Sequence, residues 1–244
     1  MAKGAFHFKR FSVEQDGAAM KVGTDGIVLG SWTSVTGAST IMDAGAGNGY
    51  VGLMLLQRAD LDTRLIGIEL EENAARQCTE NYATQPFPSH ATAWQGSIQK
   101  AAALPQFRNQ ADLIISNPPF YRNKPKSPDH ARNLARHDDT LTMGDLAKAS
   151  HAMLREGGRL CTIWPMDRLE EWMEWGEGCG FQPKQTVLVQ TMRHLEPKRF
   201  LSEWVKTERN SVKHQQNQLT LEGKATLDFT EEYLSIVRPY LRGT

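Results

Sequence analysis

The residue types most suggestive of chemistry occur where an apolar segment runs into two consecutive prolines. Residues 111–116 are followed by Asn117, Pro118, Pro119 and Phe120. Proline has no backbone N–H and cannot continue a central strand, so the strand must end at Asn117. The Asn117 side chain and the Pro118 carbonyl are then free acceptors beside the flat ring of Phe120. Two acceptors and a ring suit a planar group that carries an NH2, such as the amine of a base; a rigid exit turn with a buried phenylalanine is the alternative.

A second segment combines glycines with two acidic residues at strand ends. Asp43 closes an apolar run and is followed by Gly45, Gly47 and Gly49 at the start of a helix-like segment. Glycines let the backbone turn sharply and approach a ligand, with a helix N-terminus behind it. Glu69 ends the next apolar run, where a carboxylate can accept both hydroxyls of a ribose. The pattern favours a nucleoside site over the alternative, a tight turn with a surface glutamate.

Composition limits the possible classes of protein. The 244-residue chain is long enough for one large α/β domain with a full core. Its 28 Lys and Arg balance 28 Asp and Glu, so any RNA contact must come from local patches. Three scattered cysteines without a Cys-x-x-Cys pair favour a reducing compartment. We find neither a signal peptide nor an apolar run of membrane-spanning length, and we expect a cytoplasmic protein without a metal.

From residue 40 onwards, apolar segments alternate with helix-like segments, which is typical of βαβ units and a parallel sheet. The predicted strands are Thr40–Ala44, Arg64–Leu70, Ala91–Gln95, Asp112–Ser116 and Arg159–Trp164, and the predicted helices are Tyr50–Arg58, Glu71–Ala83 and Met143–Leu154.

The C-terminal third has a different pattern. A further helix is expected to begin at Asp167, with Glu170 three residues later as in a capping box. Gln185–Thr191 and Phe200–Lys206 are predicted to pair as a hairpin, and Thr230–Leu241 is predicted to form a last helix with its first residue as N-cap. We predict a single domain over residues 1–244, in which residues 1–39 are an N-terminal extension that covers the cofactor site.

These segments resemble a known family. The order from Asp43 to Gly49 is similar to motif I of class I S-adenosylmethionine (SAM) methyltransferases, and residues 117–120 resemble the (N/D/S)PP(Y/F/W) signature of amino-group methyltransferases. Residues 6–11, 15–30, 135–137 and Leu141 resemble the bacterial tRNA1(Val) adenine-37 N6-methyltransferases. The resemblance implies a Rossmann-like class I methyltransferase fold with a mostly parallel seven-stranded sheet and a C-terminal antiparallel hairpin. It also implies SAM as cofactor and tRNA as partner.

The resemblance also implies roles for individual residues. Asp25 would pair with the ammonium group of SAM and Lys21 with its carboxylate, although a charged loop before a helix is an equal alternative. Ser97 stands where many SAM enzymes have an aspartate that binds the adenine amine. Cofactor-binding residues would be Lys21, Thr24, Asp25, Asp43, Gly45, Gly47, Gly49, Glu69, Ser97 and Asn117, and catalytic residues would be Asn117, Pro118, Pro119 and Phe120.

Two basic segments are candidates for RNA contact. Residues 121–137 contain five basic residues, Arg122, Lys124, Lys126, Arg132 and Arg136, against one acidic residue. Residues 184–214 contain seven basic residues, among them Lys198 and Arg199, against three acidic residues. Such segments hold phosphates in RNA-binding proteins, and solvated loops are the alternative.

The activity predicted from all of this is SAM-dependent methylation of the N6 amine of an adenine in tRNA, with adenine 37 of tRNA1(Val) as the expected target. A protein-glutamine N5-methyltransferase has a similar Asn-Pro-Pro loop. A guanine-N2 rRNA methyltransferase is favoured only by Phe120, because adenine enzymes more often have tyrosine there. A SAM-binding RNA module without activity is the non-enzymatic alternative.

Overall fold

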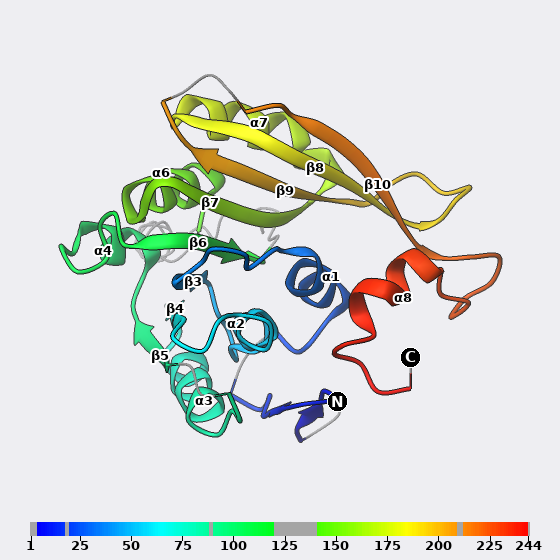
Figure 1. Cartoon of the computed structure of the whole chain (residues 1–244), viewed down its shortest axis with the longest axis horizontal. Coiled ribbons are helices and arrows are strands. Elements are labelled where there is room, and N and C mark those ends of the chain that lie inside the picture. The colour runs from blue at the N-terminus through cyan, green and yellow to red at the C-terminus, as the bar shows by residue number, and fades with distance from the viewer. Residues whose placement is uncertain (1–3, 18–19, 88–89, 120–140, 209–211, 244) are drawn as a thin grey trace, which may run out of the picture.

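The computed structural model describes residues 4–17, 20–87, 90–119, 141–208 and 212–243, and one large sheet forms its centre (Figure 1). The strands follow the order β10-β8-β9-β7-β6-β3-β4-β5. Neighbouring strands are parallel except where β9 pairs with β7 and β8. The bounds are β3 (Thr40–Ala44), β4 (Arg64–Glu69), β5 (His90–Gln95), β6 (Ala111–Ser116), β7 (Leu154–Pro165), β8 (Phe181–Met192), β9 (Arg199–Lys206) and β10 (Gln215–Glu222). The predicted Rossmann-like α/β fold is confirmed.

The sheet has one more strand than predicted among the described residues. The expected hairpin is present as antiparallel β8 and β9, with Val187 opposite Leu201. Beyond it, β10 adds to the edge in parallel with β8. Its first four residues, Gln215 to Gln218, are polar and exposed, so they lack the apolar alternation that predicts a strand. An edge strand is bound by backbone pairing on one side only, which polar side chains permit.

Helices cover both faces of the sheet (Figure 1). Alternation along the central strands supplies two cores: Ile41 and Leu113 belong to one cluster, and Met42 and Ile114 to the other. The first cluster includes residues of α1 (Thr24–Trp32), α2 (Tyr50–Leu56), α3 (Glu72–Ala83) and α8 (Glu231–Val237), and the second includes residues of α4 (Ile98–Ala103), α6 (Met143–Met153) and α7 (Leu169–Gly178).

Two predicted helix starts had different outcomes. Thr230 is the N-cap of α8, and its hydroxyl accepts a hydrogen bond from the Tyr233 amide at 3.1 Å. Asp167 does not cap a helix, because it lies inside a short 3-10 turn (Met166–Arg168) and α7 begins at Leu169 without a side-chain cap. The prediction at Asp167 was wrong because the chain leaves β7 through this tighter turn. The sequence pattern also missed α4.

The N-terminal segment is attached to the C-terminal one. Its two short strands, β1 (Phe6–His7) and β2 (Ser12–Val13), form a separate antiparallel pair. Phe8 is fully buried, and the backbone amide of Lys9 donates to the carbonyl of Tyr240 at 2.7 Å. Phe8 belongs to the same apolar cluster as the central strands. This packing favours the prediction of one domain over residues 1–244, which stays a prediction.

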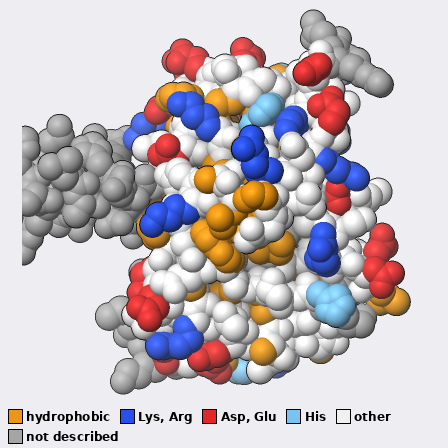
Figure 2. Space-filling view, turned by 90° about the vertical axis from the view of Figure 1, so that its left-hand side faces the viewer, with side chains coloured by type: hydrophobic (Ala, Val, Ile, Leu, Met, Phe, Trp, Pro, Cys, Tyr) orange, Lys and Arg blue, Asp and Glu red, His pale blue; other side chains and the backbone are white. Residues whose placement is uncertain are grey.

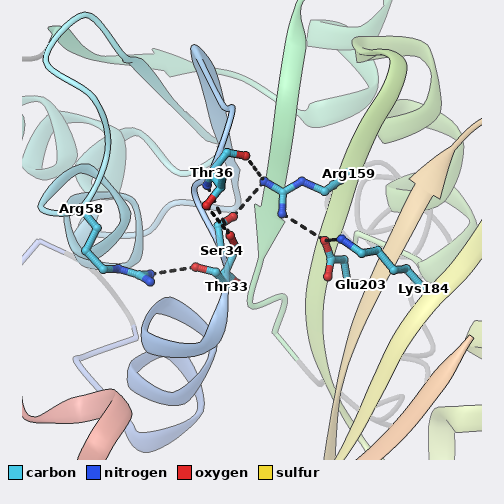
Figure 3. Close-up of polar contacts among 7 residues, drawn as sticks. All are labelled: Thr33, Ser34, Thr36, Arg58, Arg159, Lys184 and Glu203. Carbon is cyan, nitrogen blue, oxygen red and sulfur yellow. Dashed lines mark hydrogen bonds and ion pairs between the residues drawn. The ribbon is translucent and has the colours of Figure 1, made fainter.

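Two arginines hold the C-terminal end of α1 (Figure 3). Arg58 donates to the carbonyls of Gly30 and Thr33, and Arg159 donates to those of Ser34 and Thr36. Helix ends leave carbonyls without intrahelical partners, so these donors stabilise the helix where it ends. Arg159 is held in turn by Glu203, at 3.0 Å, and Lys184 shares that carboxylate at 3.1 Å. Helix α1 is thus anchored to the sheet at its far end, which fixes its N-terminal end at the site described next.

Candidate functional site

A cavity of about 280 Å³ lies at the carboxyl ends of β3, β4 and β6. Here β3 lies between β4 and β6, so the strand order changes direction, which is where open α/β sheets bind ligands. The structure therefore brings together residues from six separate segments of the sequence. Those predicted from the sequence that line it are Lys21, Asp43, Gly45, Gly47, Glu69, Ser97, Asn117 and Pro119.

The glycine loop forms one wall of the cavity. Gly45 and Gly47 have φ angles of 74° and 57°, which favour glycine. The backbone amides of Gly45 and Ala46 both donate to the carbonyl of Ile68 on the neighbouring strand, at 2.8 and 3.1 Å. A Cβ added at Gly45 or Gly47 would meet no atom within 4 Å, so open space lies beside the backbone. The loop is shaped to let a ligand approach the main chain closely.

Glycine is needed at position 49 for a different reason, which is the packing of neighbouring helices. Gly49 does not line the cavity, and a Cβ there would lie 2.5 Å from the ring of Tyr82 and 2.9 Å from Sγ of Cys78. Its φ of 83° also lies in the left-handed region. The absence of a side chain at Gly49 therefore allows α2 and α3 to pack closely.

Asp43 is buried at the end of β3 and supports the helix behind the loop. It is 2% exposed, and its Oδ2 accepts a hydrogen bond from the Gly52 amide at 2.9 Å. Burial raises the pKa of the Asp43 carboxyl to about 7, the Gly52 hydrogen bond opposes that rise, and nearby Glu69 adds to it. The carboxyl group fixes the first turn of α2 and faces the cavity.

Glu69 joins three segments at the end of β4. Its Oε2 accepts from the Gly47 amide at 2.8 Å, and its Oε1 accepts from the Glu71 amide at 2.9 Å. Each carboxylate oxygen can accept more than one hydrogen bond, so both keep acceptor capacity toward the cavity. The side chain is thereby fixed in a position where two neighbouring hydroxyl groups can be bound.

Asn117 lies where β6 ends, on the opposite side of the cavity. Its Oδ1 is buried and has no hydrogen-bond partner among the residues that the structure describes. A buried amide oxygen without a partner is costly, so an acceptor left open at a cavity indicates a place for a ligand donor. Pro118 is buried and Pro119 lines the cavity. Phe120 lies outside the described residues.

The three residues expected near the methionine end of SAM are placed differently from one another. Lys21 lines the cavity, whereas Thr24 and Asp25, in the first turn of α1, do not. Oδ2 of Asp25 forms an ion pair with Nε of Arg199, at 2.9 Å. The structure thus brings together Asp25 and a residue that we expected to contact RNA.

Ser97 is the N-cap of α4. Its hydroxyl accepts a hydrogen bond from the Lys100 amide at 3.2 Å, and it lines the cavity. The hydroxyl proton remains available to a ligand acceptor. An aspartate at this position could only accept, so Ser97 supplies a different hydrogen-bonding character at the same place.

Sequence reasoning missed Tyr50, the first residue of α2. It is 6% exposed and lines the cavity. Burial is the main reason that the pKa of its hydroxyl is raised well above the usual range, and hydrogen bonds with Gly23 and the Asn117 side chain oppose that rise. The available signal was its position directly after the glycine loop. Met20 and Leu141 also line the cavity; both belong to the segments that resembled the family, but no role was predicted for them.

The predicted RNA-binding residues are only partly described. Lys198 is exposed, and Arg199 is half-buried at the start of β9. The residues Arg122, Lys124, Lys126, Arg132 and Arg136 lie outside the described residues.

In the part of the chain that the structure describes, no cluster of three or more His, Cys, Asp or Glu is arranged to hold a metal ion. No helix among those residues has the length and apolar character needed to cross a membrane.

Comparisons with known proteins identify the family. Residues 28–168 match the family model described as the methyltransferase small domain. The fold resembles a crystal structure described as a predicted O-methyltransferase from Agrobacterium tumefaciens, with a TM-score of 0.69, 16% identity and coverage of 91% of this chain and 100% of that one. It also resembles TYW2 from Pyrococcus horikoshii in complex with MeSAdo, with a TM-score of 0.59, 10% identity and coverage of 84% and 71%. The protein is a SAM-dependent methyltransferase.

Sequence relatives define the group more closely. A tRNA1(Val) (adenine(37)-N6)-methyltransferase from Trichodesmium erythraeum is 36% identical over 98% of both chains. A protein of the same name from Porphyromonas gingivalis is 35% identical over 98% of this chain and 96% of its own. The chain belongs to the tRNA1(Val) (adenine(37)-N6)-methyltransferase family, as its motifs predicted.

Proposed function

We propose that this protein transfers a methyl group from SAM to the N6 amine of adenine 37 in tRNA1(Val). The observation that carries the proposal is the position of Asn117, whose buried amide oxygen lacks a partner among the described residues at the cavity formed by the glycine loop. The relatives named for this reaction match the chain over nearly its full length. A tRNA substrate implies a cytoplasmic location.

The described residues fit SAM as cofactor. Gly45 and Gly47 provide a cradle that a Cβ would fill, which suits close contact between a ligand and the backbone. Glu69 would accept the ribose hydroxyls with the acceptor capacity that its backbone hydrogen bonds leave. Ser97 would contact the adenine, and Lys21 the methionine carboxylate.

The sequence predicted that Asp25 pairs with the ammonium group of SAM, and this role needs revision. Because Oδ2 already pairs with Arg199, Asp25 would act at the cofactor ammonium only together with that arginine or through its other oxygen. We therefore assign to Thr24 and Asp25 the shaping of the α1 N-terminus beside the site, with Lys21 as the direct contact.

The chemistry depends on orientation of the amine. SAM supplies a methyl group that is already activated by its sulfonium. The lone pair of an aromatic amine is conjugated with the ring, so it is not directed toward the methyl group. Asn117 Oδ1 and the Pro118 carbonyl would accept hydrogen bonds from the two N–H groups of the amine. These hydrogen bonds would turn its lone pair toward the methyl donor. Phe120 would stack on the flipped base, and the released proton would pass to solvent.

Contact with the rest of the tRNA would depend on local basic segments. Figure 2 shows Lys and Arg side chains dispersed among acidic ones, in keeping with the balanced charge of the chain. We propose that the segment after Asn117, with Arg122, Lys124, Lys126, Arg132 and Arg136, contacts phosphates near the flipped base. Lys198, next to the Arg199 that holds Asp25, would add a contact near α1.

The test is methylation of total tRNA with labelled SAM, followed by nucleoside analysis and then by assay of tRNA1(Val) transcripts. We expect N6-methyladenosine, and we expect it to disappear when adenine 37 is replaced by guanine. N2-methylguanosine as product, or label on a protein glutamine instead of tRNA, would contradict the proposal. The matched protein control is Asn117→Ala.

A further inference from the structure

Asn48 lies in the glycine loop between Gly47 and Gly49, and its side chain carries an unused hydrogen-bond donor. The residue is 1% exposed and lines the cavity. Its amide nitrogen, Nδ2, is buried and has no hydrogen-bond partner among the residues that the structure describes. A buried N–H group without a partner costs free energy, so a donor left open in the wall of a cavity indicates a place for a ligand acceptor.

The orientation of the Asn48 amide follows from its other end. Oδ1 accepts a hydrogen bond from the backbone amide of Tyr50 at 3.3 Å, two residues later in the chain. A backbone N–H can only donate, so it selects the oxygen of the side chain and leaves the NH2 group as the free end. Rotation of the side-chain amide by half a turn would place NH2 against N–H and lose this bond. The loop therefore presents a donor in a fixed orientation.

The loop around Asn48 is fastened to the N-terminal segment. Asn81 of α3 is 3% exposed, and its Nδ2 donates to the carbonyl of Asn48 at 2.8 Å and to the carbonyl of Glu14 at 3.1 Å. A second attachment is the 3.4 Å hydrogen bond from the hydroxyl of Tyr50 to the carbonyl of Gly23. Asn48 therefore lies at the end of the cavity that the N-terminal segment borders.

This end of the cavity also carries Lys21, which lies between the two attachments in the sequence and is assigned above to the methionine carboxylate of SAM. An NH2 group can only donate, so the group that meets Asn48 must be an acceptor, which excludes the ammonium and the sulfonium of SAM. The ribose hydroxyls and the adenine are assigned to Glu69 and Ser97. The carboxylate remains, and a hydrogen bond to a charged acceptor is stronger than one between neutral groups.

We infer that Asn48 is a cofactor-binding residue, whose amide nitrogen donates a hydrogen bond to the carboxylate at the methionine end of SAM. The inference rests on the proposed function, through its placement of SAM, and adds to it a neutral donor beside the charge of Lys21. Asp43 and Glu69 also line the cavity. A further anionic group that enters it therefore needs donors that replace its lost hydration.

The test compares the binding of two ligands by calorimetry. S-adenosylhomocysteine (SAH), the demethylated product, has the carboxylate, whereas 5′-methylthioadenosine has the same adenine and ribose but no amino-acid group. Asn48→Ala should lower the ratio of SAH affinity to 5′-methylthioadenosine affinity about tenfold, the usual effect of losing a hydrogen bond to a charged group. The ratio is the readout because a change in loop shape alone weakens both ligands. Asn217→Ala, on the exposed part of β10, is the control in which neither affinity should change.

A second variant separates the donor from the geometry of the loop. Asn48→Asp keeps an oxygen for the Tyr50 amide and replaces NH2 by a second oxygen. Relative to wild type, its SAH affinity should fall further as pH rises, because the ionised side chain repels the carboxylate.

An unchanged affinity ratio in Asn48→Ala would overturn the inference. A gain of SAH affinity in Asn48→Asp as pH rises would also overturn it, since it would place the ammonium of the ligand beside this residue. Failure of the proposed function would be seen separately, as an unmodified tRNA with the wild-type protein, and SAH binding would still decide the role of Asn48.

Discussion

The backbone amide of Gly52 donates a 2.9 Å hydrogen bond to Oδ2 of Asp43, nine residues earlier in the chain. This bond ties the end of β3 to the first turns of α2 and sets the curvature of the glycine loop between them. The carboxyl group that accepts it is almost fully buried, and burial raises its pKa to about 7. The residue that shapes the glycine loop is therefore a source of pH dependence.

The raised pKa of Asp43 predicts how stability changes with pH. Its ordinary pKa is 3.8. Between pH 3.8 and about pH 7, the carboxyl group is therefore protonated in the folded protein and ionised in the unfolded chain. The contribution of this group to the free energy of unfolding falls as pH rises through that range. Asp43→Asn keeps an acceptor for Gly52 without the charge. Its Tm relative to wild type should be higher at about pH 8 than at about pH 5. A Tm difference that does not vary with pH would contradict this.

Gly47 should be required for cofactor binding because its missing side chain leaves the space for the ligand. Gly47→Val should weaken SAM binding at least tenfold by calorimetry, since the added atoms fill the cradle and strain a φ of 57°. Gly37→Val is the matched control, because Gly37 also has a positive φ, of 72°, with open space beside it and lies away from the cavity. If both variants lose stability equally but bind SAM normally, the loop does not hold the cofactor.

Asn117→Ala should keep the fold and SAM affinity while losing methyl transfer. The residue lies after the last residue of β6, and removal of one of two amine acceptors is expected to cost about 3 kcal/mol, or roughly a hundredfold in rate. Single-turnover methylation of tRNA measures this. Asn217→Ala, at an exposed position of the edge strand β10, is a control in which the rate should not change. A near-normal rate in Asn117→Ala would rule out the orientation mechanism.

The basic segment after Asn117 should bind tRNA through charge. Replacement of Arg122, Lys124 and Lys126 by glutamate should weaken tRNA binding at low salt, and the difference from wild type should shrink as salt rises, because phosphate contacts release counterions. SAM affinity should not change. Glutamate at three exposed basic residues outside both candidate RNA-contact segments provides the control: Arg76, Arg108 and Lys224. Equal losses in both triple variants would mean that only net charge matters.

The sequence by itself determined the features that depend on local backbone requirements. The prolines after Asn117 had to end a strand, and the glycines after Asp43 had to form a turn with positive φ angles. The alternation of apolar segments determined the parallel sheet and its two cores, and so placed Asn117, Asp43 and Glu69 at one edge. Each of these is a property of a few neighbouring residues.

Only the tertiary structure decided which distant groups meet. Arg199 pairs with Asp25, 174 residues earlier, and the Tyr50 hydroxyl lies in a space that Gly26 leaves open. The polar strand β10 joins the sheet because β8 offers it backbone partners. Local patterns do not encode these pairings, since each depends on the relative positions of elements that are set by packing of the whole core. The meeting of Asp25 with Arg199 is therefore a property of the fold, although each residue is visible in the sequence.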